Sequence, residues 1–119
     1  MVKLIAILKR KPGMSFEDFK KHYETSHVPL VSGMQGDLLK AYVRNYSDGE
    51  NPYPVGKPNS FDCVTEFHYD SIEDMIAAAA AIQDPKNEQA VRDDERKFLD
   101  IDNVEIFVAD TRTRLDGVF

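Results

Sequence analysis

Residues 38–69, LLKAYVRNYSDGENPYPVGKPNSFDCVTEFHY, contain two strand-like segments that flank a long, turn-rich loop. The loop, residues 47–59, holds three of the six prolines, so neither strand continues through it. Side chains in residues 61–69 alternate between two faces. One face carries Phe61, Cys63, Thr65 and Phe67; the other carries Asp62, Val64, Glu66 and His68. The stretch predicts a hairpin of two strands, residues 38–46 and 61–69.

Upstream, residues 2–10, VKLIAILKR, carry apolar side chains on both alternating faces, which is typical of a central strand. Pro12 and Gly13 end this strand. A helix is expected to follow, because Ser15 can cap it and aromatic residues recur at helical spacing. These aromatic residues are Phe16, Phe19 and Tyr23. Pro29 is expected to limit the helix, because the residue before a proline is pushed out of the helical conformation.

Downstream, Ser71 is expected to cap a second helix, which ends at Asp84-Pro85. Residues 86–99 are predicted to form a third helix and residues 103–110 a fourth strand. The resulting order, β-α-β-β-α(α)-β, predicts an α+β, ferredoxin-like fold. In this fold a four-stranded antiparallel sheet is covered by helices on one face.

The composition is that of a globular protein, with 42% hydrophobic and 30% charged residues. A length of 119 residues allows one domain, residues 1–119. The formal net charge of −6 disfavours nucleic acids and anionic membranes as partners. The longest apolar run, residues 76–82, is too short to span a bilayer, and no signal peptide is recognisable. We therefore expect a cytoplasmic location.

The second face of the predicted sheet would be bare in a monomer, although several strands place apolar or aromatic residues on it. A face-to-face homodimer is the expected arrangement. A monomer with a polar outer face is the alternative.

His27 and Asp94 are the candidates for acid–base chemistry. His27 continues the stripe of Phe19 and Tyr23 inward, and an imidazole has a pKa of about 6.5. Asp94 lies between Val91 and Phe98 on the apolar stripe of its helix, where a carboxylate needs a partner. If the two side chains meet, the carboxylate orients the ring. The alternatives are a histidine bonded to the backbone and an aspartate at the boundary with solvent.

Other polar groups on the strands could bind a substrate. Tyr42 and Arg44 could hold a phenolic or anionic compound, and His68 could line a cavity, but a sheet surface uses such residues as often. His22 is expected to be solvated. Cys63 is expected to be a buried thiol and not a nucleophile. There is no phosphate-binding loop, HExxH, CxxC or GxSxG motif, so we expect no cofactor and no metal.

Three segments resemble the EthD-domain family, a branch of the dimeric α+β barrel superfamily. Residues 9–31, KRKPGMSFEDFKKHYETSHVPLV, resemble the opening of these proteins. Residues 61–71, FDCVTEFHYDS, and 93–100, DDERKFLD, resemble fungal-type members. The resemblance implies a cofactor-free site in each protomer, between helices and sheet, where His27, Asp94 and Phe98 match family positions.

The resemblance also implies a reaction class. Relatives are associated with aromatic polyketide tailoring as decarboxylases or dehydratases. The methylmuconolactone isomerases are similar but carry a histidine in the long loop and a cysteine on the third strand. Here Tyr53 and Phe67 stand at those places, which argues against isomerase chemistry. Together with the residue-level reasoning, this predicts a cleft for a small aromatic substrate, with substrate contacts from Tyr23, Tyr42, Phe67, His68 and Phe98.

The lead hypothesis is a cofactor-independent lyase, a decarboxylase or dehydratase, in which His27 and Asp94 move a proton next to a carbonyl. One alternative is a cofactor-free monooxygenase of phenolic, anthrone-type substrates, and another is a non-catalytic binding dimer. A further alternative, metal-dependent chemistry, requires His22, His27 and His68 to share one coordination sphere.

Overall fold

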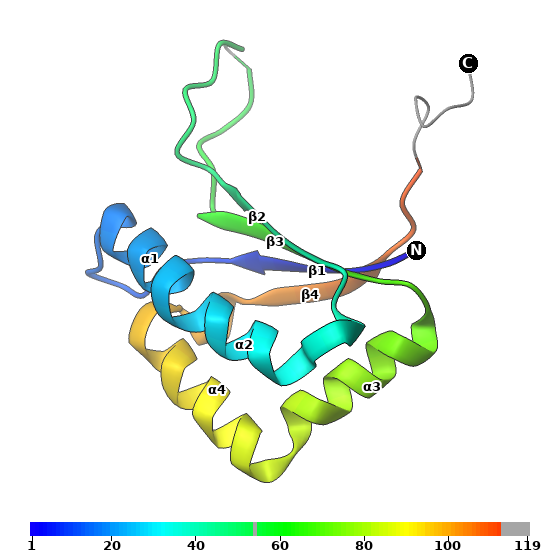
Figure 1. Ribbon diagram of the computed structural model, residues 1–119. Coiled ribbons are helices and arrows are strands. Elements are labelled where there is room, and N and C mark those ends of the chain that lie inside the picture. Colours follow the sequence, from blue (N-terminus) through cyan, green and yellow to red (C-terminus); the bar gives the residue numbers. More distant parts are fainter. Residues whose placement is uncertain (54, 113–119) are drawn as a thin grey trace.

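The computed structural model describes residues 1–53 and 55–112, in which an antiparallel sheet carries all its helices on one face (Figure 1). The strands are β1 Val2–Leu8, β2 Ala41–Tyr46, β3 Cys63–Tyr69 and β4 Glu105–Ala109. The helices are α1 Phe16–His22, α2 Val28–Gln35, α3 Ile72–Gln83 and α4 Pro85–Phe98. A π-helical turn, Tyr23–His27, and short 3-10 turns, Gly36–Leu38 and Ile101–Asn103, complete the order. No described helix is both long enough and apolar enough to cross a membrane.

The strand order is β2-β3-β1-β4, and every neighbouring pair is antiparallel. The predicted α+β, ferredoxin-like fold is therefore confirmed, with β1 in the interior of the sheet. The register places Ala6 opposite both Thr65 and Ile106. Because opposed residues of an antiparallel pair point to the same face, these three side chains all point toward the helices.

The expectation that Pro29 ends the first helix is wrong. α1 passes through the π turn into α2, and Pro29 is the second residue of α2. The Val28 N–H donates to the Tyr23 carbonyl, five residues back. This wider turn changes the hydrogen-bond pattern just where the proline has no N–H to offer, so the helix continues past it.

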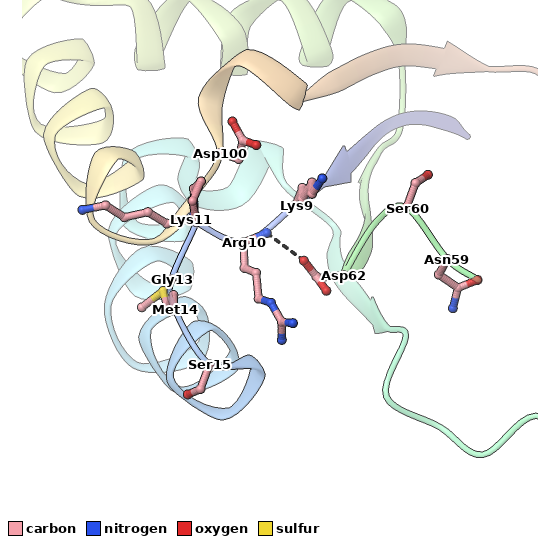
Figure 2. A pocket seen from close by; sticks show the side chains of 11 residues that line it. Lys9, Arg10, Lys11, Gly13, Met14, Ser15, Asn59, Ser60, Asp62 and Asp100 are labelled. Carbon is pink, nitrogen blue, oxygen red and sulfur yellow. Dashed lines mark hydrogen bonds between the residues drawn. The ribbon is translucent and has the colours of Figure 1, made fainter. Parts of the chain in front are cut away.

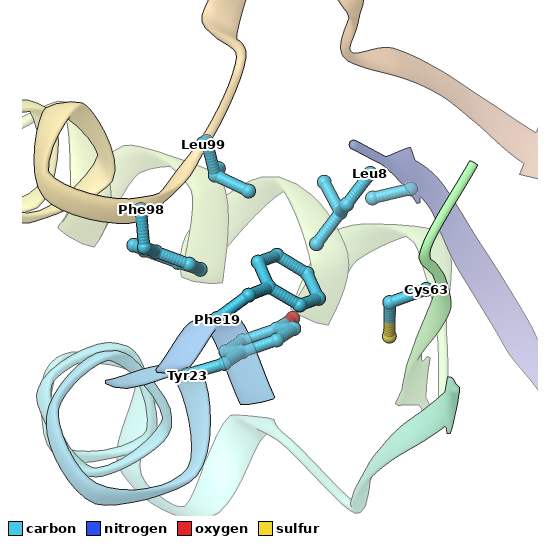
Figure 3. Close-up of a cluster of buried hydrophobic side chains, with 7 residues drawn as sticks. Leu8, Phe19, Tyr23, Cys63, Phe98 and Leu99 are labelled. Carbon is cyan, nitrogen blue, oxygen red and sulfur yellow. The ribbon is translucent and has the colours of Figure 1, made fainter. Parts of the chain in front are cut away.

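The sheet and the helices enclose an aromatic core (Figure 3). Phe19 and Tyr23 come from the first helical segment and Phe98 from the end of α4, and they pack over Leu8 and Cys63 of the sheet. The ring centroids of Phe98 and Tyr23 are 5.4 Å apart, and those of Phe98 and Phe19 are 5.8 Å apart. Close edge-to-face and tilted contacts of this kind add to the energy of burial.

Phe98→Ala should lower the free energy of unfolding by about 3–5 kcal/mol, because it leaves a cavity where a fully buried ring was. Urea denaturation monitored by circular dichroism measures this loss. The matched control is Tyr53→Ala, which removes an aromatic side chain that is 73% exposed and should change stability by less than about 0.5 kcal/mol. A loss below about 1.5 kcal/mol for Phe98→Ala would contradict the described packing.

The face of the sheet opposite the helices is uncovered in the protomer (Figure 1). The register gathers one apolar cluster there, which we call the open-face cluster: Ile5, Ile7, Val43, Val64 and Phe107. Glu66 lies within this cluster, opposite both Val43 and Ile5, and accepts hydrogen bonds from His68 at 3.0 Å and Asn45 at 3.0 Å. An apolar cluster of this kind is typical of a surface that another molecule covers.

Candidate active site

A cavity of about 260 Å³ lies between the helices and the sheet. That is the volume of about nine molecules of liquid water, slightly below the usual range for small-molecule sites. Most of the wall is apolar or aromatic: Leu4, Ala6, Tyr42, Phe67 and Tyr69 from the sheet, and Val31, Met75, Ala79, Ile82 and Val91 from the helices. Its polar groups are His27, Gln35, Gln83, Arg92 and Glu95.

His27 and Asp94 meet at the wall of this cavity. The distance between His27 Nδ1 and Asp94 Oδ2 is 2.9 Å, and both side chains are buried. Asp94 does not line the cavity, so it lies behind the ring. The predicted contact between these two residues is therefore present, and it has the geometry in which a carboxylate orients an imidazole.

Asp94 accepts two further hydrogen bonds, from Ser26 Oγ at 2.9 Å and from His22 Nε2 at 3.0 Å. Burial alone raises the pKa of the Asp94 carboxyl, but the hydrogen bonds from His27, Ser26 and His22 outweigh it and hold the pKa below its ordinary value. Asp94 is therefore ionised at neutral pH. An ionised carboxylate only accepts hydrogen bonds, so His27 Nδ1 carries a proton and donates it to Asp94.

The second ring nitrogen of His27, Nε2, faces open space. Within residues 1–53 and 55–112, every side-chain nitrogen or oxygen that is sealed from solvent has a hydrogen-bond partner. Nε2 has no partner in the described protein, so it is not sealed, and His27 is one of the residues that line the cavity. Burial lowers the pKa of His27 below its ordinary value, and the hydrogen bond to Asp94 offsets only part of this. Nε2 is therefore an unprotonated base at neutral pH.

The π turn places His27 in this position. Buried side chains recur at every fourth residue along the continuous helix: Phe19, Tyr23, His27, Val31 and Gln35. In a regular α-helix a step of four residues overshoots one turn by about 40°, so four steps drift by about 160°. The turn from Tyr23 to His27 contains more residues than an α-helical turn and takes back part of this rotation. One row of side chains can thus face the core along the whole segment.

The expectation that His22 is solvated is wrong. Its ring is half-buried, bonds to Asp94 and lies 4.9 Å from the Phe98 ring, centroid to centroid. The spacing of His22 and Ser26, four residues apart, contained the signal for a shared face. The wider turn that also brings His27 to this face has no signature in composition.

Two tyrosines form a hydrogen-bonded chain at the cavity. Tyr42 donates to the Tyr23 hydroxyl at 3.0 Å, and Tyr23 lies 2.7 Å from Thr65 Oγ1. Burial raises the pKa of Tyr23 and the pKa of Tyr42 far above the ordinary value for a phenol. Both phenols therefore stay protonated, and Tyr42, at the end of this chain, can turn its proton to a substrate oxygen.

The residues predicted to contact the substrate lie in three different places in the structure: at the cavity, in the core and on the open face of the sheet. Tyr23, Tyr42 and Phe67 line the cavity, as expected. Phe98 does not line it, because the ring is fully buried and packs 5.0 Å from the His27 ring, centroid to centroid. His68, which was expected to contact the substrate, does not line this cavity, because it lies on the open face of the sheet, opposite Lys3 in the register.

The strand residues Arg44 and Cys63 are both engaged in the structure. Arg44 forms a bidentate ion pair with Glu24, at 2.8 Å and 2.6 Å, so its guanidinium does not serve the cavity. Burial raises the pKa of the Cys63 thiol to about 11, and the thiol lies 3.6 Å from Thr65 Oγ1. A protonated, buried thiol is a poor nucleophile.

The metal hypothesis fails on geometry. In the part of the chain that the structure describes, no three His, Cys, Asp or Glu residues are placed to hold a metal ion. The sheet separates His68 from His22 and His27. These histidines do not share a coordination sphere.

A larger, more open hollow of about 690 Å³ lies at the end of β1 (Figure 2). Its lining is mostly polar and charged, and the Arg10 N–H donates to Asp62 Oδ2 at 2.8 Å. The side chains of Arg10 and Lys11 point in different directions (Figure 2), so the cations of this loop do not converge. This hollow shares no lining residue with the cavity at His27. The smaller, apolar cavity is the better candidate for a small-molecule site.

Comparison with known proteins shows which family the chain belongs to. Residues 11–102 match the family model described as the EthD domain. The chain is 26% identical over 100 residues to the conidial pigment biosynthesis dehydratase EthD of Metarhizium robertsii, covering 76% of this chain and 68% of that protein. It is 30% identical over 100 residues to the dehydratase ustZ of Ustilaginoidea virens, covering 76% and 69%.

Solved structures share the fold. An ethyl tert-butyl ether D (EthD) family protein from Bacillus halodurans superimposes with a TM-score of 0.65 at 24% identity, covering 94% of this chain and 99% of that chain. A dimeric ferredoxin-like protein of unknown function from Thermobifida fusca gives a TM-score of 0.60 at 15% identity, covering 91% and 88%. At these identities the likeness establishes the architecture alone.

Proposed function

Because the chain belongs to the EthD domain family, we propose that it is a cofactor-independent dehydratase acting on a fused-ring aromatic polyketide or a related phenolic compound. One observation carries the proposal: His27 Nδ1 donates to Asp94 across 2.9 Å, which leaves Nε2 free at an apolar, aromatic-lined cavity. The two curated relatives named dehydratases support water loss over the decarboxylation that the same two residues could also serve.

In the proposed reaction, His27 Nε2 removes a proton from the carbon next to a substrate carbonyl. The electron pair forms a double bond to the neighbouring carbon as that carbon loses its hydroxyl group. The protonated His27 returns the proton to the departing oxygen, which leaves as water, so the histidine ends as it began. Asp94 stabilises the imidazolium in between, as in other histidine–carboxylate pairs.

The protonated tyrosines supply the donor for the carbonyl oxygen. Tyr42 lines the cavity, and its hydroxyl can turn from Tyr23 to an oxygen that gains negative charge as the proton leaves. Arg92 is the one lysine or arginine among the described residues that line the cavity, and it pairs with Glu95 at α4. An acidic substituent of the substrate would find its counter-charge there.

The proposal is tested with 3-hydroxy-1-tetralone, a two-ring β-hydroxy ketone whose loss of water gives 1-naphthol. We expect the purified protein to accelerate the formation of 1-naphthol, measured by its fluorescence, equally in air and under nitrogen. Product formation that requires oxygen would favour a monooxygenase. Binding of 1-naphthol without any acceleration of water loss, across a panel of two-ring β-hydroxy ketones, would favour a binding protein.

The rate should fall at acid pH. Protonated His27 cannot accept a proton, so kcat/KM should be constant from about pH 7 to pH 9 and fall about tenfold per pH unit in the acid limb. Because burial lowers the pKa of His27, the midpoint should lie below the ordinary histidine value of about 6.5. The measurement is the pH profile of 1-naphthol formation at constant ionic strength. A midpoint well above pH 6.5 would contradict a buried, neutral base.

We also propose that the open-face cluster is the interface of a homodimer, as the name of the dimeric relative from Thermobifida fusca supports. Phe107→Asp places a charge at the β4 side of this cluster, next to Ile5, and should convert the dimer to a monomer in analytical ultracentrifugation. Ile76→Asp is the matched control, because Ile76 is an exposed apolar residue on α3, away from the sheet. A monomeric wild-type protein at micromolar concentration would contradict the proposal.

A further inference from the structure

Gln35 is a buried polar residue of the cavity that the proposed reaction does not use. It is the last residue of α2, it is 7% exposed, and it lines the cavity. The Tyr69 hydroxyl donates to Gln35 Oε1 at 2.5 Å. Buried polar groups are normally hydrogen-bonded, so the NH₂ group of this amide is also expected to have a partner.

The hydrogen bond from Tyr69 fixes the orientation of the Gln35 amide. Tyr69 is buried, and burial raises its pKa to about 12, so the phenol keeps its proton. Gln35 is the one described partner of this hydroxyl, and the hydroxyl donates its proton to the amide oxygen Oε1. Oε1 therefore faces Tyr69, and the NH₂ group is turned the other way.

The NH₂ group of Gln35 faces open space. In the described part of the chain, no sealed side-chain nitrogen or oxygen lacks a partner. The Gln35 nitrogen has no partner there, so it is not sealed, and Gln35 is one of the residues that line the cavity. The cavity thus has a fixed N–H donor in a wall that is otherwise mostly apolar.

Gln35 lies on the same wall as His27, eight residues further along the helix. At a rise of 1.5 Å per residue, the two residues are separated by about 12 Å along the helix axis. Val31 lies between them, with Leu4, Tyr42 and Phe67 across the cavity. The base and the amide donor therefore stand at opposite ends of one apolar surface, a distance that suits a flat, two-ring compound with an oxygen at each end.

We propose that Gln35 determines substrate specificity by donating an N–H to a hydroxyl or carbonyl oxygen at the end of the substrate remote from His27. Tyr69 is a positioning residue that holds the amide in the donating orientation. This inference rests on the proposed function in one respect, namely that the end of the substrate next to His27 is the end that reacts. A site with such a donor prefers compounds that carry the matching oxygen, because the donor is otherwise left without a partner.

The test compares the binding of two probes by isothermal titration calorimetry: 2,6-dihydroxynaphthalene, with an oxygen at each end, and 2-naphthol, with one. The wild-type protein should prefer the first probe by roughly 10- to 100-fold. Gln35→Leu should abolish this preference and leave the affinity for 2-naphthol within about twofold. Gln83→Leu, at an exposed glutamine that also lines the cavity, is the matched control and should keep the preference.

Tyr69→Phe separates positioning from a general loss of structure. It removes the hydroxyl that holds Oε1 but keeps the aromatic ring in the cavity wall, so the amide can turn and the preference should fall to an intermediate value. This variant also decides the question if Gln35→Leu does not fold, as judged by circular dichroism. Equal binding of both probes by the wild-type protein, or an unchanged preference in Gln35→Leu or Tyr69→Phe, overturns the inference. If the wild-type protein discriminates the two probes but does not accelerate the loss of water from β-hydroxy ketones, the proposed function is refuted and the role of Gln35 in binding is not.

Discussion

His27→Gln should lower kcat for 1-naphthol formation by about 10²–10⁴-fold, the usual contribution of a positioned acid–base group. Glutamine keeps a polar side chain that can still bond to Asp94, but its amide does not accept a proton at neutral pH. The His27 ring and Asp94 are both buried, so the substitution changes a defined contact and not a mobile surface group. The acid limb of the pH profile should also disappear, because the group that titrates is gone.

His68→Gln is the control for this experiment. The residue was expected from the sequence to contact substrate, but the structure places it on the open face with Glu66, so kcat should stay within about twofold of wild type. Far-ultraviolet circular dichroism should be unchanged in both variants. If His27→Gln retains a tenth or more of the wild-type kcat, His27 is not the base.

Asp94→Asn should have an effect of similar size by a different route. The asparagine NH₂ group can donate to His27 Nδ1, which moves the ring proton to Nε2 and leaves no base at the cavity. We expect kcat to fall by about 10³–10⁴-fold. The loss of a charged acceptor for His22 and Ser26 should also lower the free energy of unfolding by about 1–3 kcal/mol.

Asp93→Asn is the matched control for Asp94, since it makes the same chemical change one residue earlier on α4. Asp93 is exposed and accepts from Arg96 and Gln89 at the surface, so both kcat and stability should be close to wild type. The proton position on His27 can be read from the ¹⁵N chemical shifts of its ring. An unaltered ring tautomer with full activity in Asp94→Asn would refute the proposed role of the carboxylate.

The architecture and one contact of the candidate site could be predicted from the sequence. Alternation in residues 61–69 separated Thr65 and Phe67 from Glu66 and His68 correctly, because a strand has a strict period of two. A carboxylate on the apolar stripe of α4 needed a buried partner, and His27 is that partner. Whether these two residues perform catalysis stays a proposal.

The features of the site that could not be predicted from the sequence depend on three-dimensional context. His68 was predicted to contact the substrate together with Phe67, although the two side chains point to different faces of the same strand. Only the position of the helices determines which of these faces encloses a cavity. Gln35 and Tyr69 are far apart in the chain and meet only when α2 packs on the sheet. A buried glutamine has no local pattern that distinguishes it from an exposed one.

The π turn from Tyr23 to His27 has a consequence for how this helix could have changed in length. The turn amounts to a one-residue insertion into an otherwise regular helix. Deleting one residue there would restore regular geometry, and three α-helical steps of about 100° would turn the chain by about 300°, close to the rotation of the wider turn that they replace. His27, Val31 and Gln35 would therefore keep roughly the same direction relative to Phe19. A one-codon insertion or deletion at this turn can thus be absorbed locally, without turning the cavity side chains away from the sheet.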